Sequence, residues 1–157
     1  MTHFPAVILL SWLAAACASN RAPDMFDAST RTEINLTAAM PSKELPLGAV
    51  PKEPDSVEVE IRRIANPGAQ AFSVWLGLVA GGPGEPGRFV ELGSLTPFPA
   101  DRTGRYLLAI PEPARAVLER CEPGTRLRVS LAPVSPDRPL PTSLEVVLAE
   151  PVWRGPR

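Results

Sequence analysis

The sequence predicts an all-β protein: a single antiparallel Ig-like β-sandwich with one short helix, after a signal peptide and a proline-rich tether. Three observations predict this. Apolar and polar residues alternate in six or seven short segments, and turn-forming residues separate these segments about every ten residues. Twenty prolines in 157 residues disfavour long helices. We therefore expect three parts: a signal peptide (1–16), a lipidated cysteine with a flexible tether (17–54) and the sandwich domain (55–157).

The chain opens with an apolar run from Phe4 to Ala16, and its first charged side chain is Arg21. This run is too short to cross a bilayer core, which takes about 20 residues, but it has the length of the apolar region of a signal peptide. The residues before it contain no Lys or Arg, which departs from the usual signal-peptide pattern. We expect the protein to be exported.

The run ends in Leu13-Ala14-Ala15-Ala16-Cys17, which resembles a bacterial lipobox. The resemblance implies that Cys17 is diacylated and becomes the mature N-terminus, although the pattern prefers Leu where Ala14 stands. Because Ala18 and not Asp follows the cysteine, the resemblance implies an anchor in the outer membrane, on its periplasmic side. Two acyl chains hold a protein firmly. The alternative is cleavage by an ordinary signal peptidase after Ala16 or Ala18, which would leave a secreted or periplasmic protein.

Residues 18–54 are interpreted as the tether. The first part, 20–32, is polar and has no periodicity, and the second part, 41–54, contains too many prolines for a helix or a central strand. Between them, Glu33 to Thr37 alternates and predicts one short edge strand.

Period-two alternation begins at Ser56, where Val57, Val59 and Ile61 alternate with charged residues. A second strand begins at Phe72; both of its faces are mostly apolar, which favours a central position in a sheet. Further strands are expected at 88–95, 106–110, 127–131 and 144–148, with Trp153 just beyond the last. The predicted core consists of Phe72, Val74, Leu76, Tyr106, Leu108, Leu127, Val129 and Val146.

One helix is predicted after Pro113, a residue that suits a first helical turn. Arg115 and Glu119 are spaced for an ion pair, and Pro123 with Gly124 ends the helix. A single apolar stripe at helical spacing should face the core; it consists of Ala114, Val117, Leu118 and Cys121.

Composition excludes several functions. The one histidine, His3, lies in the segment expected to be removed, so the mature protein has no histidine for a catalytic triad or for a zinc or copper site. Sixteen basic against seventeen acidic residues do not indicate nucleic-acid binding. If Cys17 is acylated, Cys121 has no cysteine with which to form an intramolecular disulfide. We therefore expect no cofactor, no metal and no catalytic residues.

Three weaker candidates remain. Glu58 and Glu60 point the same way along one strand, but a glycosidase needs carboxylates that face each other across a cleft, so a solvated face is favoured. The glycine-rich segment 81–87 lacks the Lys-Ser/Thr ending of a phosphate-binding loop and favours a hairpin loop. Trp75 and Trp153 could form an aromatic platform for a sugar or peptide, although at least one is expected in the core.

From Leu45 onward, the order of features resembles the C-terminal β-sandwich of bacterial tyrosinase and polyphenol-oxidase chains. The resemblance covers roughly two-thirds of the chain. The segments that carry it are Leu45-Pro46-Leu47-Gly48, Ser56-Val57-Glu58-Val59-Glu60, Ala71-Phe72-Ser73-Val74, Phe89-Val90-Glu91-Leu92-Gly93-Ser94-Leu95, Gly104-Arg105-Tyr106-Leu107-Leu108 and 126–134. The histidine-bearing copper domain of that family is absent. The resemblance implies an accessory domain that packs against a partner domain.

Together these observations predict a non-catalytic envelope lipoprotein. Its sandwich would be a binding or assembly module that docks on another protein, for which the resemblance suggests an oxidase-type copper protein. The alternatives are a small-ligand-binding lipoprotein and a histidine-free enzyme that uses carboxylates. The expected partners are the membrane, through the lipid, and a protein; nucleic acid is not expected.

Overall fold

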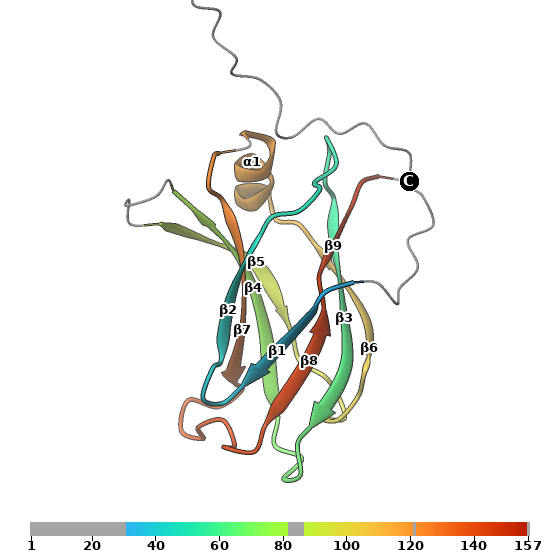
Figure 1. Cartoon of the computed structure of the whole chain (residues 1–157), viewed down its shortest axis with the longest axis vertical. Coiled ribbons are helices and arrows are strands. Elements are labelled where there is room, and N and C mark those ends of the chain that lie inside the picture. The colour runs from blue at the N-terminus through green and yellow to red at the C-terminus, as the bar shows by residue number, and fades with distance from the viewer. Residues whose placement is uncertain (1–30, 82–86, 121, 157) are drawn as a thin grey trace, which may run out of the picture.

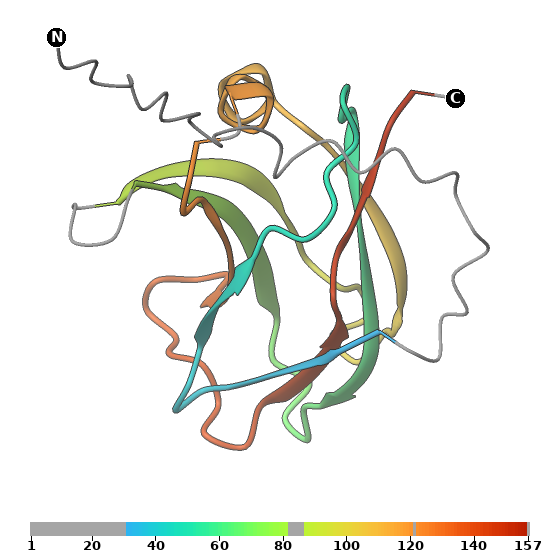
Figure 2. The same ribbon diagram turned by 45° about the horizontal axis from the view of Figure 1, so that its top comes forward.

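The computed structural model describes residues 31–81, 87–120 and 122–156, and these residues form two antiparallel sheets packed face to face (Figure 1). The first sheet has the strand order β1-β8-β3-β6, with β9 also paired to β3. The second sheet has the order β2-β7-β4-β5. This is the predicted all-β sandwich, and Figure 2 shows its two layers from one end.

The strand bounds follow the alternation in the sequence. The first sheet contains β1 (Glu33–Thr37), β8 (Glu145–Ala149), β3 (Ser56–Ala65), β6 (Gly104–Ala109) and β9 (Val152–Arg154). The second contains β2 (Ser42–Pro46), β7 (Arg126–Pro133), β4 (Phe72–Ala80) and β5 (Arg88–Leu95). As predicted, β4 lies inside its sheet, between β7 and β5, and its two mostly apolar faces agree with that position.

The core lies between the sheets. Of the eight predicted core residues, Phe72, Val74, Leu76, Leu127, Val129 and Val146 are buried. Tyr106 and Leu108 are only partly buried, because β6 is the edge strand of the first sheet and is covered from one side. The prediction was therefore wrong in degree for these two residues.

The helix α1 (Glu112–Arg120) connects β6 of the first sheet to β7 of the second and lies at one end of the sandwich (Figure 1). Its stripe of Ala114, Val117 and Leu118 is buried, as predicted; Cys121, the fourth member, is outside the described residues. The sequence predicted an ion pair between Arg115 and Glu119. In the structure, the guanidinium of Arg115 lies 3.8 Å from the carboxylate of Glu112.

The sandwich begins well before residue 55, which corrects the predicted tether. Glu33 to Thr37 is the expected edge strand, and its Ile34 and Leu36 belong to the core. Ser42 to Pro46 forms a second edge strand, β2, because an edge position tolerates proline. Pro41 takes part through its carbonyl group, which accepts a hydrogen bond of 2.7 Å from the N–H of Leu131.

The segment between β2 and β3 is also attached to the domain. The indole N–H of Trp153 donates a hydrogen bond of 2.8 Å to the carbonyl oxygen of Leu47. Asp55 donates its backbone N–H to Arg154 and accepts one from Ile110, at 2.9 and 2.8 Å. Residues 31–54 of the predicted tether therefore belong to the folded domain, and residues 17–30 lie outside the described residues.

Candidate functional site

The predicted carboxylate pair lies on the outer face of the first sheet and is enclosed by arginines. Glu58 and Glu60 are 14% and 17% exposed, and the guanidinium of Arg31 lies 3.4 Å from the first and 3.6 Å from the second. Arg154 lies 2.6 Å from Glu58, and Arg105 lies 3.7 Å from Glu60. The face is therefore a shielded ionic cluster and not the freely solvated surface that was expected.

The electrostatics of Glu58 oppose a role as proton donor. Burial of the carboxyl raises its pKa, but hydrogen bonds and charge from Arg154 and Arg31 outweigh burial, so the pKa of Glu58 is lowered from 4.5. A group held ionised in this way cannot supply a proton at neutral pH. Because Glu58 and Glu60 lie on one strand, they also do not face each other across a cleft.

The two tryptophans do not form a common platform. Trp153 is 7% exposed and belongs to the core on β9 of the first sheet, as expected for at least one of the pair. Trp75 lies on β4 of the second sheet and is 37% exposed. One indole therefore lies in the core and the other on the outside of the second sheet.

Trp75 is part of a surface on the outside of the second sheet, which we call the aromatic face. Strand register places Ser130 and Ser94 on either side of Trp75, and Arg128 and Glu91 on either side of Gly77, two residues further along β4. The face is defined by Trp75, Gly77, Phe89, Glu91, Ser94, Arg128 and Ser130.

Phe89, which is 48% exposed, is fixed on this face by Gly77. A Cβ atom added at Gly77 would stand only 2.2 Å from Cζ of Phe89, so the ring lies directly against the glycine backbone. The guanidinium carbon of Arg128 is 5.7 Å from the centre of the same ring, within the range of a cation–π contact. The Phe89 ring is therefore held by two contacts, one with the backbone of Gly77 and one with the guanidinium of Arg128.

Arg128 is itself fixed by Glu44 on β2. Its Nε donates to Oε1 of Glu44 at 3.1 Å, and Nε of Arg126 lies 3.1 Å from the other carboxylate oxygen. The hydrogen bond from Arg128 is the main reason that the pKa of Glu44 is lowered, and the charges of Arg126 and Arg128 act in the same direction against desolvation.

Sequence reasoning did not identify Phe89 as a surface residue, but a signal was present. An isolated glycine inside an apolar strand marks a bulge or a close approach of another group. Gly77 shows both, because the register with β5 shifts between Leu76 and Gly77.

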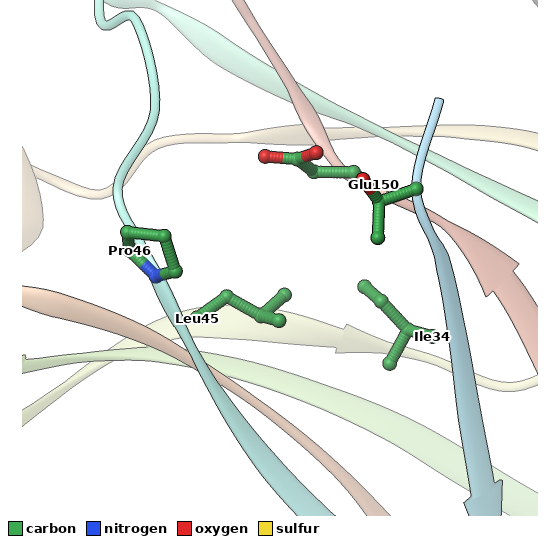
Figure 3. A pocket seen from close by; sticks show the side chains of 5 residues that line it. Ile34, Leu45, Pro46 and Glu150 are labelled. Carbon is green, nitrogen blue, oxygen red and sulfur yellow. The ribbon is translucent and has the colours of Figure 1, made fainter. Parts of the chain in front are cut away.

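A small hollow lies at the opposite edge of the sandwich from β5 and β6, between β1 and β2 (Figure 3). Its volume is about 120 Å³. Ile34 and Leu45 form an apolar floor, and the carboxylate of Glu150 points across the hollow toward Pro46. The lining residues are Thr32, Ile34, Leu45, Pro46 and Glu150.

Two predicted features lie outside the described residues: Cys17, the expected lipidation site, and most of the glycine-rich segment 81–87. Within the described ranges, no helix has the length and apolar character to span a membrane. Over the same ranges, His, Cys, Asp and Glu side chains do not gather in threes where they could hold a metal ion.

The structure thus defines a two-layer β-sandwich with an ionic cluster on one outer face and an aromatic face on the other. No family model matches the sequence, and no curated protein matches it.

Proposed function

We propose that this protein is a lipid-anchored envelope module whose sandwich docks on another protein through the aromatic face. The observation that carries the proposal is the arrangement of Trp75, Phe89 and Arg128 on the outside of the second sheet. Trp and Arg are the residue types most enriched at the energetic centres of protein interfaces, and aromatic residues in general are enriched there.

The construction of the face also supports docking. Phe89 is held against Gly77, and Arg128 is held by Glu44, so both side chains have a defined position before a partner arrives. A surface that is already ordered loses less conformational entropy on binding. The neighbouring serines, Ser94 and Ser130, supply hydroxyl groups for the polar surroundings that interfaces place around such a centre.

The anchor in this proposal is Cys17, diacylated and held in the outer membrane. Thirteen residues, 18–30, separate it from Arg31, where the described structure begins. A chain of that length spans at most about 50 Å. The proposed sandwich therefore reaches less far from the membrane than a tether of residues 17–54 would allow, so the surface on which it docks lies within that shorter reach of the anchor.

The proposal includes no catalysis, since the carboxylates of the ionic cluster are held by arginines. The sequence resemblance suggests an oxidase-type copper protein as the partner. Cross-linking of the sandwich to such a protein would support a relationship to the tyrosinase C-terminal domain.

Site-specific photo-cross-linking in intact cells tests the proposal. A photoreactive phenylalanine analogue is placed at Trp75 or Phe89 in an affinity-tagged full-length copy, and captured proteins are identified by mass spectrometry. The matched control is the same analogue at Leu107, which is 64% exposed on the outer face of the first sheet. We expect one reproducible adduct from positions 75 and 89 that is absent from position 107. Equal capture at all three positions, or capture at none, would contradict docking through the aromatic face.

A further inference from the structure

The hollow between β1 and β2 lies on a different part of the molecule from the aromatic face. β1 is the edge strand of the first sheet and β2 the edge strand of the second, so the hollow opens where the two layers of the sandwich meet (Figures 2 and 3). An edge strand offers backbone groups to an incoming extended segment. The position therefore suits a polypeptide that lies along the edge and inserts one side chain.

The shape and the apolar character of the hollow limit which side chain can enter it. Leu45 is half-buried and Pro46 is exposed, so together they present an aliphatic wall above the buried Ile34. A volume of about 120 Å³ is well below the range of about 300–1,000 Å³ typical of pockets for drug-sized ligands. An unbranched alkyl chain matches this space better than an aromatic ring or a cofactor.

The charge of the hollow selects a cation. Glu150 uses its backbone N–H in a hydrogen bond of 2.9 Å to the carbonyl oxygen of Thr32, which ties the rim of the hollow to β1. Among the described residues, no cationic side chain lies within ion-pairing distance of the Glu150 carboxylate. Its Oε1 lies 3.7 Å from the position that a Cβ on Gly48 would take, and its side chain lines the hollow. A carboxylate at the mouth of an aliphatic hollow is complementary to an ammonium group on an alkyl stem.

We propose that this hollow binds a lysine side chain of an extended segment from another polypeptide. The methylene groups of the lysine lie against Leu45 and Pro46, and its ammonium group donates to Glu150, with the Thr32 hydroxyl as a second acceptor. Lysine carries a compact charge on a flexible four-carbon stem, whereas arginine presents a planar fork that a single carboxylate at the rim does not favour. The site is separate from the aromatic face, so it does not depend on docking there.

The test is a titration followed by NMR. The full chain, carrying Cys17→Ser so that it is not acylated, is isotopically labelled and titrated with N-acetyl-lysine N-methylamide. We expect saturable shifts at the amide of Thr32 and at the methyl groups of Ile34 and Leu45. The Nε-acetylated and norleucine analogues, which keep the stem but lack the charge, should bind about fivefold more weakly, the size of one partly exposed ion pair.

Two variants complete the test. Glu150→Gln should weaken binding of the lysine probe by the same factor, and Glu119→Gln, which removes one exposed carboxylate from α1, should leave it unchanged. Both variants should keep the wild-type amide spectrum elsewhere. Equal binding of the norleucine analogue, tighter binding of the arginine analogue, or an undiminished affinity in Glu150→Gln would overturn the proposal, as would the absence of saturable shifts.

Discussion

The ring of Phe89 occupies the space that a side chain at Gly77 would fill, with Cζ and Cε2 at 2.2 and 2.3 Å from the position of such a Cβ. The two residues belong to neighbouring strands, β5 and β4, and the strand register shifts beside Gly77. The glycine therefore permits an aromatic ring to pack against the strand at this position, where it also meets Arg128.

This relationship predicts the effect of Gly77→Ala. The new methyl group must displace the Phe89 ring, and overpacking of this kind costs about 1–3 kcal/mol of unfolding free energy. Chemical denaturation measures the loss. In the double variant Gly77→Ala/Phe89→Ala the clash is absent, so the two changes should be clearly non-additive. Gly68→Ala, at a position with open space around it, is the control; an equal loss there would contradict this explanation.

The packing of the core predicts which truncations lower the unfolding free energy. Leu76 and Val129 are fully buried in the second sheet and face the first. Truncation of Leu76 to Ala should lower the unfolding free energy by about 2–4 kcal/mol, and truncation of Val129 should also be destabilising, because each leaves a cavity. Val134→Ala, at a half-exposed position, should change it little. A far-UV circular dichroism spectrum of residues 31–157 dominated by helix would contradict the fold itself.

The ionic cluster predicts how stability depends on pH. The pKa of Glu58 in the folded protein is lowered from 4.5 despite burial, through Arg154 and Arg31. A lowered pKa means that the ionised carboxylate stabilises the fold at pH values above 4.5, and that this contribution is lost as the pH falls through the folded-state pKa. Thermal unfolding followed between pH 7 and pH 3 should show this loss in the wild type and a smaller one in Glu58→Gln. Direct titration of the Glu58 carboxyl carbon by NMR should show its pKa rise toward 4.5 in Arg154→Met; an unchanged pKa there would contradict the assignment of cause.

The anchor predicts a labelling result. Cys17 should incorporate a palmitate analogue when the full chain is made in a Gram-negative host, and Cys17→Ser should not. Cys121→Ser is the matched control and should label like the wild type. Unchanged labelling of the Cys17 variant would contradict lipidation, and full-length protein that begins at Met1 in the cytosol would contradict export.

Much of the sandwich could be predicted from the sequence because alternation reports burial directly. The strands that begin at Ser56 and Phe72 each have one side against the core, and each was located by its apolar period. The prediction was wrong between residues 33 and 54, since proline content was taken as a sign of a free tether. Proline excludes a central strand but permits an edge, and β2 lies at an edge.

The surfaces were harder to predict than the core. The enclosure of Glu58 depends on Arg31 and Arg154, which lie far from it in the sequence and meet it only through the pairing of β3 with β9 and the position of the chain before β1. The hollow depends on β1 and β2 belonging to different sheets. Such juxtapositions follow from topology, and local periodicity carries no information about them.

If Cys17 is fixed in a membrane, the contacts of Arg31 affect how the domain responds to tension on the chain. Any tension in the connecting segment enters the domain at this residue, whose guanidinium lies between Glu58 and Glu60. The load then reaches β1 at Glu33, at the end of a ladder in which that residue opposes Ala149 of β8. In an anchored protein, tension would therefore have to separate Arg31 from two carboxylates before it reached the backbone pairing of β1 with β8.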